Sequence, residues 1–295
     1  MDTVYFEDIT ELKEYDDEFD DISNIIVKFD NLTSDDIVNN INILKKIQNL
    51  DCAATQITDI PNVLINLQYL ECIGSRITKI PKEFVNLQHL NCYNTKITEI
   101  PISFVNLHSL YCSETSIKEI PKELINLTRL NCSQTQITEI PKELVNLHSL
   151  YCSKTQITEI PNVLINLRIL KCEDTKITEI PKELINLQEL VCAYTQLTEI
   201  PNVLINLRIL KCYNTKITEI PKELINLRNL ICYNTKITEI PDSLVNIIDL
   251  DCSRTQIKEI PVNLHLLKYL ESDCITLKKH KANVKKYKNE IKDIV

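Results

Sequence analysis

Twelve cysteines are the residues of this sequence best suited to metal or covalent chemistry, and their spacing is regular. Eleven recur every twenty residues from Cys52 to Cys252, and Cys274 follows the last of them. A structural zinc site needs four ligands that converge tetrahedrally, often from closely spaced cysteine pairs. Single thiols spaced in this way supply neither feature. We therefore interpret the column as a ladder of reduced, buried thiols, with incidental oxidation and a metal site as the alternatives.

Other catalytic or ligand-binding groups are sparse. One glycine, Gly74, is too few for a glycine-rich phosphate loop. A column of glutamates from Glu99 to Glu259 gives one carboxylate per twenty residues, whereas calcium needs six to eight converging oxygens. That column is expected to form a solvated outer ridge. No Ser-His-Asp or Cys-His spacing recurs among the histidines, which are His89, His108, His148, His265 and His280. We expect no catalysis, no cofactor and no metal.

A unit of twenty residues must position these side chains. It repeats from about Ile47 to Glu271 without insertion or deletion, and one copy reads NLRILKCEDTKITEIPKELI. Whole columns hold one residue type, as at Leu50 to Leu270 and Thr55 to Thr255, where Ser75 is the exception. A short unit repeated without spacers indicates stacked turns, each too small to bury its own apolar side.

Each unit is expected to contain one strand and one return segment. Residues around Leu70 and Cys72 alternate between apolar and polar, which is typical of a strand with one buried face. Successive strands would be parallel and about 4.8 Å apart. The proline of the I-P-x-x-L segment lacks an N–H, so the return side is predicted to be extended or a short 3₁₀ turn.

The repeat resembles the leucine-rich repeat family, whose pattern is L-x-x-L-x-L-x-x-N-x-L. The matching residues of one copy are Leu167, Leu170, Cys172, Thr175 and Ile177, with Cys in place of the third Leu and Thr in place of Asn. The I-P-x-x-L segment is similar to the twenty-residue class of bacterial effectors and of giant-virus and amoebal repeat proteins. The resemblance implies an α/β leucine-rich-repeat solenoid (a horseshoe) with a parallel sheet on the concave face, an extended or 3₁₀ convex side and helical caps.

Three regions are expected: an acidic tail and cap over 1–46, eleven repeats over 47–271, and a lysine-rich cap over 272–295. Residues 1–21 carry ten acids and one lysine, which predicts a solvated tail. Residues 34–46 are predicted to form a helix that covers the first repeat, although an adaptor motif is an alternative there. A second helix is predicted over 280–294, with a basic arm for nucleic acid or membrane as its alternative.

Charge and hydropathy indicate which ligands are disfavoured and in which compartment the protein works. The formal net charge of −8 disfavours nucleic acid as the main ligand. The N-terminal residues have no basic start followed by an apolar stretch, and no apolar run approaches the ~18 residues of a membrane helix. A free-thiol ladder favours a reducing compartment, so a cytoplasmic location is expected.

The resemblance implies that the variable residues of each strand and of the following turn face the concave side. Eight of the eleven tyrosines fall at such positions, and tyrosine is enriched in binding hot spots, although it also suits strands. The candidate binding residues combine aromatic area with positive charge and are Tyr93, Tyr111, Arg129, Tyr151, Lys171, Tyr194, Lys211, Tyr213 and Tyr233. The mildly basic C-terminal half favours a partner protein of modest negative charge.

The sequence therefore predicts a protein-binding platform without a small-molecule substrate. Two alternatives remain open. Because similar bacterial effectors can carry a ubiquitin-ligase domain, this chain could recognise substrates for a ligase supplied in trans. It could also be a repeat-expanded protein without a refined ligand, since CYNTKITEIP occurs at 92–101, 212–221 and 232–241.

Overall fold

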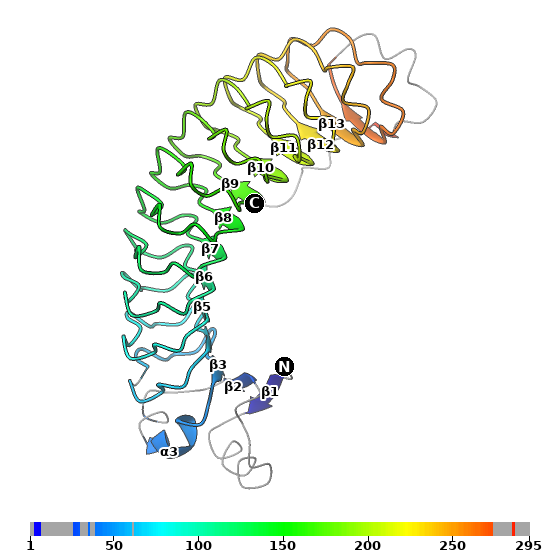
Figure 1. The fold of residues 1–295 in the computed structure, drawn as a ribbon. Coiled ribbons are helices and arrows are strands. Elements are labelled where there is room, and N and C mark those ends of the chain that lie inside the picture. Colours follow the sequence, from blue (N-terminus) through cyan, green and yellow to red (C-terminus); the bar gives the residue numbers. More distant parts are fainter. Residues whose placement is uncertain are drawn as a thin grey trace. The chain divides into compact units, whose positions relative to one another are not determined.

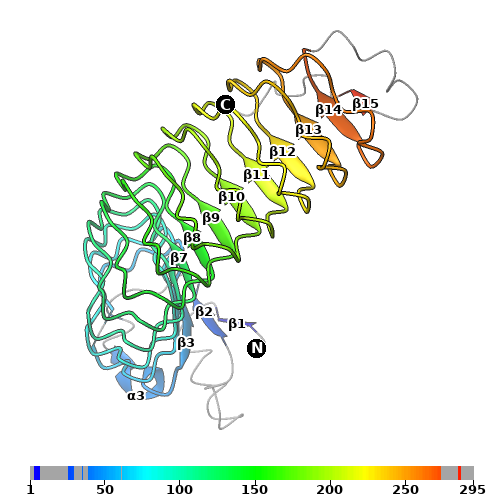
Figure 2. The ribbon, with the colours of Figure 1, turned by 45° about the horizontal axis from the view of Figure 1, so that its top comes forward.

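The computed structural model describes residues 3–6, 26–29, 35, 39–60, 62–273 and 285–286. The chain divides into two compact units, Met1–Leu147 and His148–Val295. Both are built in the same way, and each is described by itself. Every repeat contributes one three-residue strand, and the strands of a unit lie side by side along one side of it, with the turns on the other side (Figures 1 and 2).

Unit 1 contains seven described strands that pair in sequence order, all in parallel. The pairing is in register from β3 onward, so Leu50 lies beside Leu70 and Leu70 beside Leu90. A short helix, α3 (Ile41–Leu44), precedes the first repeat. The strands are β1 (Thr3–Phe6), β2 (Ile26–Phe29), β3 (Asn49–Asp51), β4 (Tyr69–Glu71), β5 (His89–Asn91), β6 (Ser109–Tyr111) and β7 (Arg129–Asn131).

Unit 2 continues the pattern with eight described strands. From β8 to β14 the register again places each strand residue beside the one twenty positions later, as for Leu190 and Leu210, whereas Tyr269 of β14 lies beside Lys285 of β15. The strands are β8 (Ser149–Tyr151), β9 (Ile169–Lys171), β10 (Glu189–Val191), β11 (Ile209–Lys211), β12 (Asn229–Ile231), β13 (Asp249–Asp251), β14 (Tyr269–Glu271) and β15 (Lys285–Lys286).

The described ends of the chain differ from the predicted caps. Within the predicted acidic tail, Thr3–Phe6 form β1, which pairs with β2, and β2 pairs with the first repeat strand, β3. Strand pairing therefore covers the edge of the first repeat. An open edge would leave backbone hydrogen-bonding groups unpaired. Of the helix predicted over 34–46, Asp35 and Asn39 are helical and α3 spans Ile41–Leu44.

At the other end, the prediction of a helix over 280–294 is wrong for the two residues that the structure describes there. Lys285 and Lys286 form β15, which pairs in parallel with β14. The rest of that predicted helix and Cys274 lie outside the described residues, so the assignment of Cys274 as the last core thiol stays a prediction.

The core consists of the Leu, Cys and Ile positions that recur in every repeat of the sequence. In the repeat that starts at Leu67, the side chains of Leu67, Leu70, Cys72 and Ile77 are fully buried. Stacking turn on turn buries each of these columns continuously, and a fully buried Leu or Ile contributes roughly 1.5–3 kcal/mol relative to an exposed one. The return side consists of two successive turns, as in the hydrogen bonds from Leu124 N to Pro121 O and from Leu127 N to Leu124 O. None of the described residues there forms a 3₁₀ helix.

A tight turn after each strand needs an unusual backbone conformation. The second residue after each ladder cysteine has a positive φ, from 52° at Asn234 and Arg254 to 63° at Gly74. This conformation costs a side-chain-bearing residue about 1–2 kcal/mol. The next residue closes the turn, because the Thr95 hydroxyl donates to the Cys92 carbonyl at 2.8 Å and its equivalents do the same in all eleven repeats. The recurring Thr (Ser at Ser75) of the repeat therefore bonds within its own turn.

A second polar column links neighbouring turns, and the sequence analysis missed it. The amide of Asn86 donates to the Ile65 carbonyl of the preceding turn at 3.1 Å, and that of Asn106 donates to Val85 at 2.9 Å. The same bond recurs at Asn126 in unit 1 and at Asn186, Asn206, Asn226 and Asn246 in unit 2. These bonds satisfy carbonyls that the narrow return side leaves without a backbone partner.

The cysteine column forms the predicted interior ladder over the described repeats. All eleven cysteines from Cys52 to Cys252 are buried and free. Burial raises the pKa of Cys92, Cys132 and Cys212 to about 12. An interior thiol of this kind packs as a small apolar group and has almost no nucleophilic thiolate at neutral pH.

We therefore expect the ladder thiols to react slowly with a thiol reagent in the native protein. At pH 8 a thiol with a pKa near 12 is ionised to the order of only 10⁻⁴, and burial blocks access as well. After denaturation the same titration should detect all twelve cysteines of the sequence. Rapid modification of more than one or two thiols in the native protein would contradict the buried ladder.

Candidate protein-binding surface

The two faces of each strand differ in exposure. The central leucine is buried, while the flanking residues are mostly half-exposed on the opposite side, as for Ser149 and Tyr151 in β8. The two residues after each cysteine extend this surface into the turn. We call this surface the open face: the first and third residues of each strand together with the two residues that follow the cysteine.

Unit 1 has an aromatic cluster on its open face. The His89 ring stacks on Tyr69 with centroids 4.4 Å apart and planes 8° apart, and it lies 5.6 Å from the Tyr111 ring. His89 Nε2 lies 3.9 Å from a Glu71 carboxylate oxygen, which is too long for a hydrogen bond. Burial lowers the pKa of His89, Glu71 opposes that shift, and the charge of Arg129 adds to it.

Tyr93 lies apart from that cluster and is exposed. Its hydroxyl donates to Glu114 at 2.9 Å, and the Gln134 amide donates to the same carboxylate oxygen at 2.9 Å. The hydrogen bond to Glu114 raises the pKa of Tyr93. This chain of three side chains spans three successive turns, so it helps to fix their surface geometry.

In unit 2 a tyrosine, a lysine and a glutamate form a closed set. The Lys171 ammonium lies 5.4 Å from the centre of the Tyr151 ring and 3.0 Å from a Glu189 carboxylate oxygen. The three residues come from neighbouring strands β8, β9 and β10. Both the positive charge of Lys171 and the face of Tyr151 are thus engaged within the protein.

Three further tyrosines form a second cluster in unit 2. Tyr213 and Tyr233 stack with centroids 4.5 Å apart and planes 11° apart, and Tyr194 meets Tyr213 edge-on at 5.5 Å and 87°. The Tyr213 hydroxyl donates to Glu173 at 3.0 Å, although forty residues separate the two. The small, buried Ala193 occupies the same column in the turn between them, which lets Tyr213 extend across it.

The C-terminal strands of unit 2 gather carboxylates on the open face. Burial raises the pKa of Asp249, and the nearby Lys211 opposes that shift. Burial also raises the pKa of Glu271, and the charges of Asp251 and Asp273 add to the effect. Like charges therefore lie close together beyond β12.

A family model described as Leucine Rich Repeat matches residues 86–107. An internalin (InlF) from Listeria monocytogenes has a similar structure, with a TM-score of 0.79 and 22% identity over 95% of this chain and 89% of that chain. The functional domain of InlJ from the same organism, described as including a cysteine ladder, has a TM-score of 0.55 and 22% identity over 76% of this chain and 64% of that chain. These similarities agree with the repeat strands and buried columns described above.

Both units are leucine-rich-repeat solenoids. The plant peptide hormone receptor RGFR1, solved in complex with RGF2, shares the fold with a TM-score of 0.65 and 24% identity over 84% of this chain and 47% of that chain. A search of curated proteins finds no significant match to the sequence. At these identities the comparisons establish the leucine-rich-repeat fold.

The leucine-rich-repeat geometry places all nine predicted binding residues on the open face. It brings together Tyr194, Tyr213 and Tyr233, and it joins Tyr151 to Lys171. Tyr111 and Arg129 lie at the His89 cluster, and Tyr93 stands apart with Glu114. Lys211 is the last residue of β11 and lies between Val191 of β10 and Ile231 of β12. Whether these residues bind a partner stays a prediction.

Sequence reasoning did not predict that Glu71, Glu114, Glu173 and Glu189 complete these clusters, although it expected Glu71, Glu173 and Glu189 on the concave face. The available signal was the register, since residues near i and i+20 become neighbours in a leucine-rich-repeat sheet. It could have identified the pairing of Tyr69 with His89 and of Tyr213 with Tyr233. The bond from Tyr213 to Glu173 was harder to find, because it depends on the small side chain of the intervening turn.

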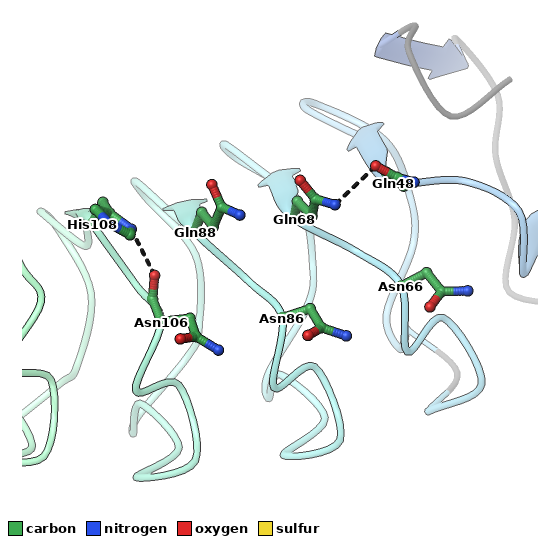
Figure 3. A pocket seen from close by; sticks show the side chains of 7 residues that line it. All are labelled: Gln48, Asn66, Gln68, Asn86, Gln88, Asn106 and His108. Carbon is green, nitrogen blue, oxygen red and sulfur yellow. Dashed lines mark hydrogen bonds between the residues drawn. The ribbon is translucent and has the colours of Figure 1, made fainter.

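A polar groove of about 450 Å³ lies at the edge where the return segments of unit 1 enter the strands (Figure 3). One row holds Gln48, Gln68, Gln88 and His108, and the other holds Asn66, Asn86 and Asn106. The three asparagine amides bond to the preceding turns, and the Gln68 amide donates to Gln48 at 2.8 Å. The groove is thus lined by groups that hold leucine-rich-repeat turns together.

Over the residues that the structure describes, no group of three or more His, Cys, Asp or Glu side chains could hold a metal ion. No helix among those residues is long and apolar enough to cross a membrane.

The lowered pKa of the half-buried His89 leads to a prediction about pH. Because its pKa is lowered in the folded state, the unfolded chain binds a proton first as the pH falls below the ordinary histidine value of about 6.5. We expect the free energy of unfolding, and with it the thermal midpoint, to fall from pH 7 to pH 5. The contribution of His89 to the free-energy slope should stay below about 1.4 kcal/mol per pH unit, which is the limit for one proton.

His89→Phe keeps an aromatic ring between Tyr69 and Tyr111 and should remove part of this slope. His108→Gln is the matched control, because His108 is exposed. An unchanged pH slope in His89→Phe would contradict the assignment.

Proposed function

We propose that this leucine-rich-repeat chain is a non-catalytic platform that binds a protein partner through the open face of its sheet. The observation that carries the proposal is the grouping of tyrosines on that face into clusters with defined geometry. Tyrosine offers a large, rigid contact area and a hydroxyl at a low cost in conformational entropy, and it is enriched in binding hot spots.

The side chains on the two sides support binding at the open face rather than at the return side. Tyr194, with 55% of its surface exposed, and the half-buried Tyr213 and Tyr233 present aromatic area next to hydrogen-bonding groups. On the return side, Glu139 and its equivalents are exposed, repeat identically, and would offer little specificity. The receptor RGFR1, which shares the fold, was solved with a peptide hormone, and this supports a protein or peptide as the ligand class.

We also propose that the protein works in a reducing compartment such as the cytoplasm. The support is the ladder of eleven free thiols on neighbouring strands, which need to stay reduced in order to pack as apolar groups.

Site-specific photocrosslinking tests the binding proposal. A photoreactive phenylalanine analogue is placed at Tyr93, Tyr151 or Tyr233, and at Glu139 or Glu159 as matched positions on the return side. We expect one partner to crosslink from the open face and not from the return side. With that partner in hand, Tyr→Ala at a hot spot should cost about 2 kcal/mol or more of affinity.

Glu159→Ala is the control for the affinity measurement, because Glu159 is exposed on the return side, and it should leave the affinity unchanged. Lys171→Ala and Lys211→Ala should act mainly on the association rate and its salt dependence. Crosslinking that comes only from Glu139 or Glu159 would show that the open face is not the binding surface.

A further inference from the structure

We propose that the corner formed by Tyr194, Tyr213 and Tyr233 is a subsite for an arginine side chain of the partner. The proposal rests on the binding function proposed for the open face, and it adds the chemistry that this part of the face selects.

The rings form two walls at nearly a right angle. Tyr213 and Tyr233 are parallel at 4.5 Å, and Tyr194 is turned by 87° relative to Tyr213 at 5.5 Å. The Tyr194 N–H donates to the Tyr213 carbonyl at 3.2 Å, so the backbone holds these two walls together. The face of an aromatic ring carries partial negative charge, and a cation near several such faces is attracted to all of them.

Carboxylates lie at both sides of this corner. Glu173 accepts the hydroxyl of Tyr213 at 3.0 Å, which leaves further oxygen lone pairs for a second donor. On the other side, burial raises the pKa of Tyr233, the charge of Asp251 adds to that shift, and the charge of Arg254 opposes it. Asp251 accepts the Ser253 hydroxyl at 2.7 Å, and Glu271 lies near both Asp251 and Asp273. The corner therefore combines aromatic faces with a negative surrounding.

The protein itself contains a filled version of this arrangement two strands away. Around Tyr151, the ring face is covered by the Lys171 ammonium, and Glu189 binds that ammonium at 3.0 Å. In the part of the chain that the structure describes, no lysine or arginine covers Tyr194, Tyr213 or Tyr233 in the same way. The combination of tyrosine and carboxylate is shared. The chain's own Arg254 is close enough for its charge to lower the pKa of Tyr233, whereas the cation that stacks on the corner is assigned to a partner.

The sequence predicted a partner of modest negative charge, whereas the corner favours a positively charged side chain. That expectation depended on lysines such as Lys171 and Lys211. Lys171 is neutralised by Glu189, and Lys211 lies near Asp249, so their positive charge is largely balanced within the fold. The carboxylates of β13 and β14 then dominate the C-terminal part of the open face.

Arginine fits the corner better than lysine does. Its planar guanidinium can stack on Tyr233 while its N–H groups reach a carboxylate, and it is more weakly hydrated than an ammonium. A single lysine offers a point charge without the stacking plane.

The test uses the full-length protein and a Gly-Ser peptide that carries arginines, with lysine, citrulline and glutamate versions as comparisons. The protein lacks Trp, so its tyrosine fluorescence reports binding directly. We expect the arginine peptide to bind more tightly than the lysine peptide and at least about tenfold more tightly than the uncharged citrulline peptide. Tyr233→Leu and Glu173→Gln should each weaken it by about fivefold, in line with the strength of cation–aromatic contacts.

Glu179→Gln is the matched control for Glu173→Gln, because Glu179 is exposed on the return side, and it should leave the affinity unchanged. Thermal melts confirm that each variant is folded. Equal binding of the arginine and citrulline peptides, or equal effects of Glu173→Gln and Glu179→Gln, would overturn the proposal.

A further set of variants tests whether the chain's own lysines occupy the corner. Replacing Lys278, Lys279 and Lys281 with Gln should not change the affinity for the arginine peptide. A clear increase would mean that these lysines compete for the corner, and it would overturn the assignment to a partner. If open-face crosslinking succeeds while no arginine peptide binds, this inference fails and the proposed function stands.

Discussion

The in-register parallel stacking of identical turns is the constraint on which the rest of the structure depends. A strand of three residues has too few hydrogen bonds to be stable alone, and it forms here because a neighbouring turn offers the same strand in the same register. An undisturbed period of twenty residues places residue i beside residue i+20 in the repeat strands of each unit, which are β3 to β7 and β8 to β14. The leucine, cysteine and isoleucine columns are buried for that reason, and an insertion in any turn would shift every later column.

The same register also produces the surface clusters. Stacking that aligns Leu210 with Leu230 aligns Tyr213 with Tyr233 as well, and it brings Lys171 over Tyr151. Surface side chains thus meet in rows, and a substitution in one repeat changes a contact with its neighbours. This is how a nearly uniform scaffold can carry distinct local chemistry: the closed set at Tyr151 and the open corner at Tyr194 differ by only a few residues.

Much of the fold follows from the sequence because the repeat columns encode it directly. The buried Leu and Cys columns and the parallel strands needed only periodicity and the alternation of apolar residues. The positive φ at the second residue after each cysteine was not predicted, because residues as unfavourable there as Lys154 and Tyr194 occupy that position beside the favoured Gly74 and Asn94. The ends were predicted poorly, because β1 and β2 lie outside the repeat and no column identifies their partners. For the candidate site, the side of the sheet on which each residue lies could be predicted. The ring orientations and the carboxylate partners could not, because they depend on the size of intervening side chains such as Ala193.

A double-mutant cycle on Tyr213 and Glu173 tests the stacking account most directly, since these residues are forty positions apart and meet only if two whole turns keep the register. Tyr213→Phe removes the hydroxyl, Glu173→Gln removes the charge, and the free energy of unfolding is measured for both single variants and the double variant. The account predicts a coupling energy of about 1 kcal/mol, as for other hydrogen-bonded side-chain pairs. A parallel cycle of Tyr213→Phe with Glu179→Gln, on the exposed return side, should be additive. Additive behaviour of Tyr213 with Glu173 would contradict the register.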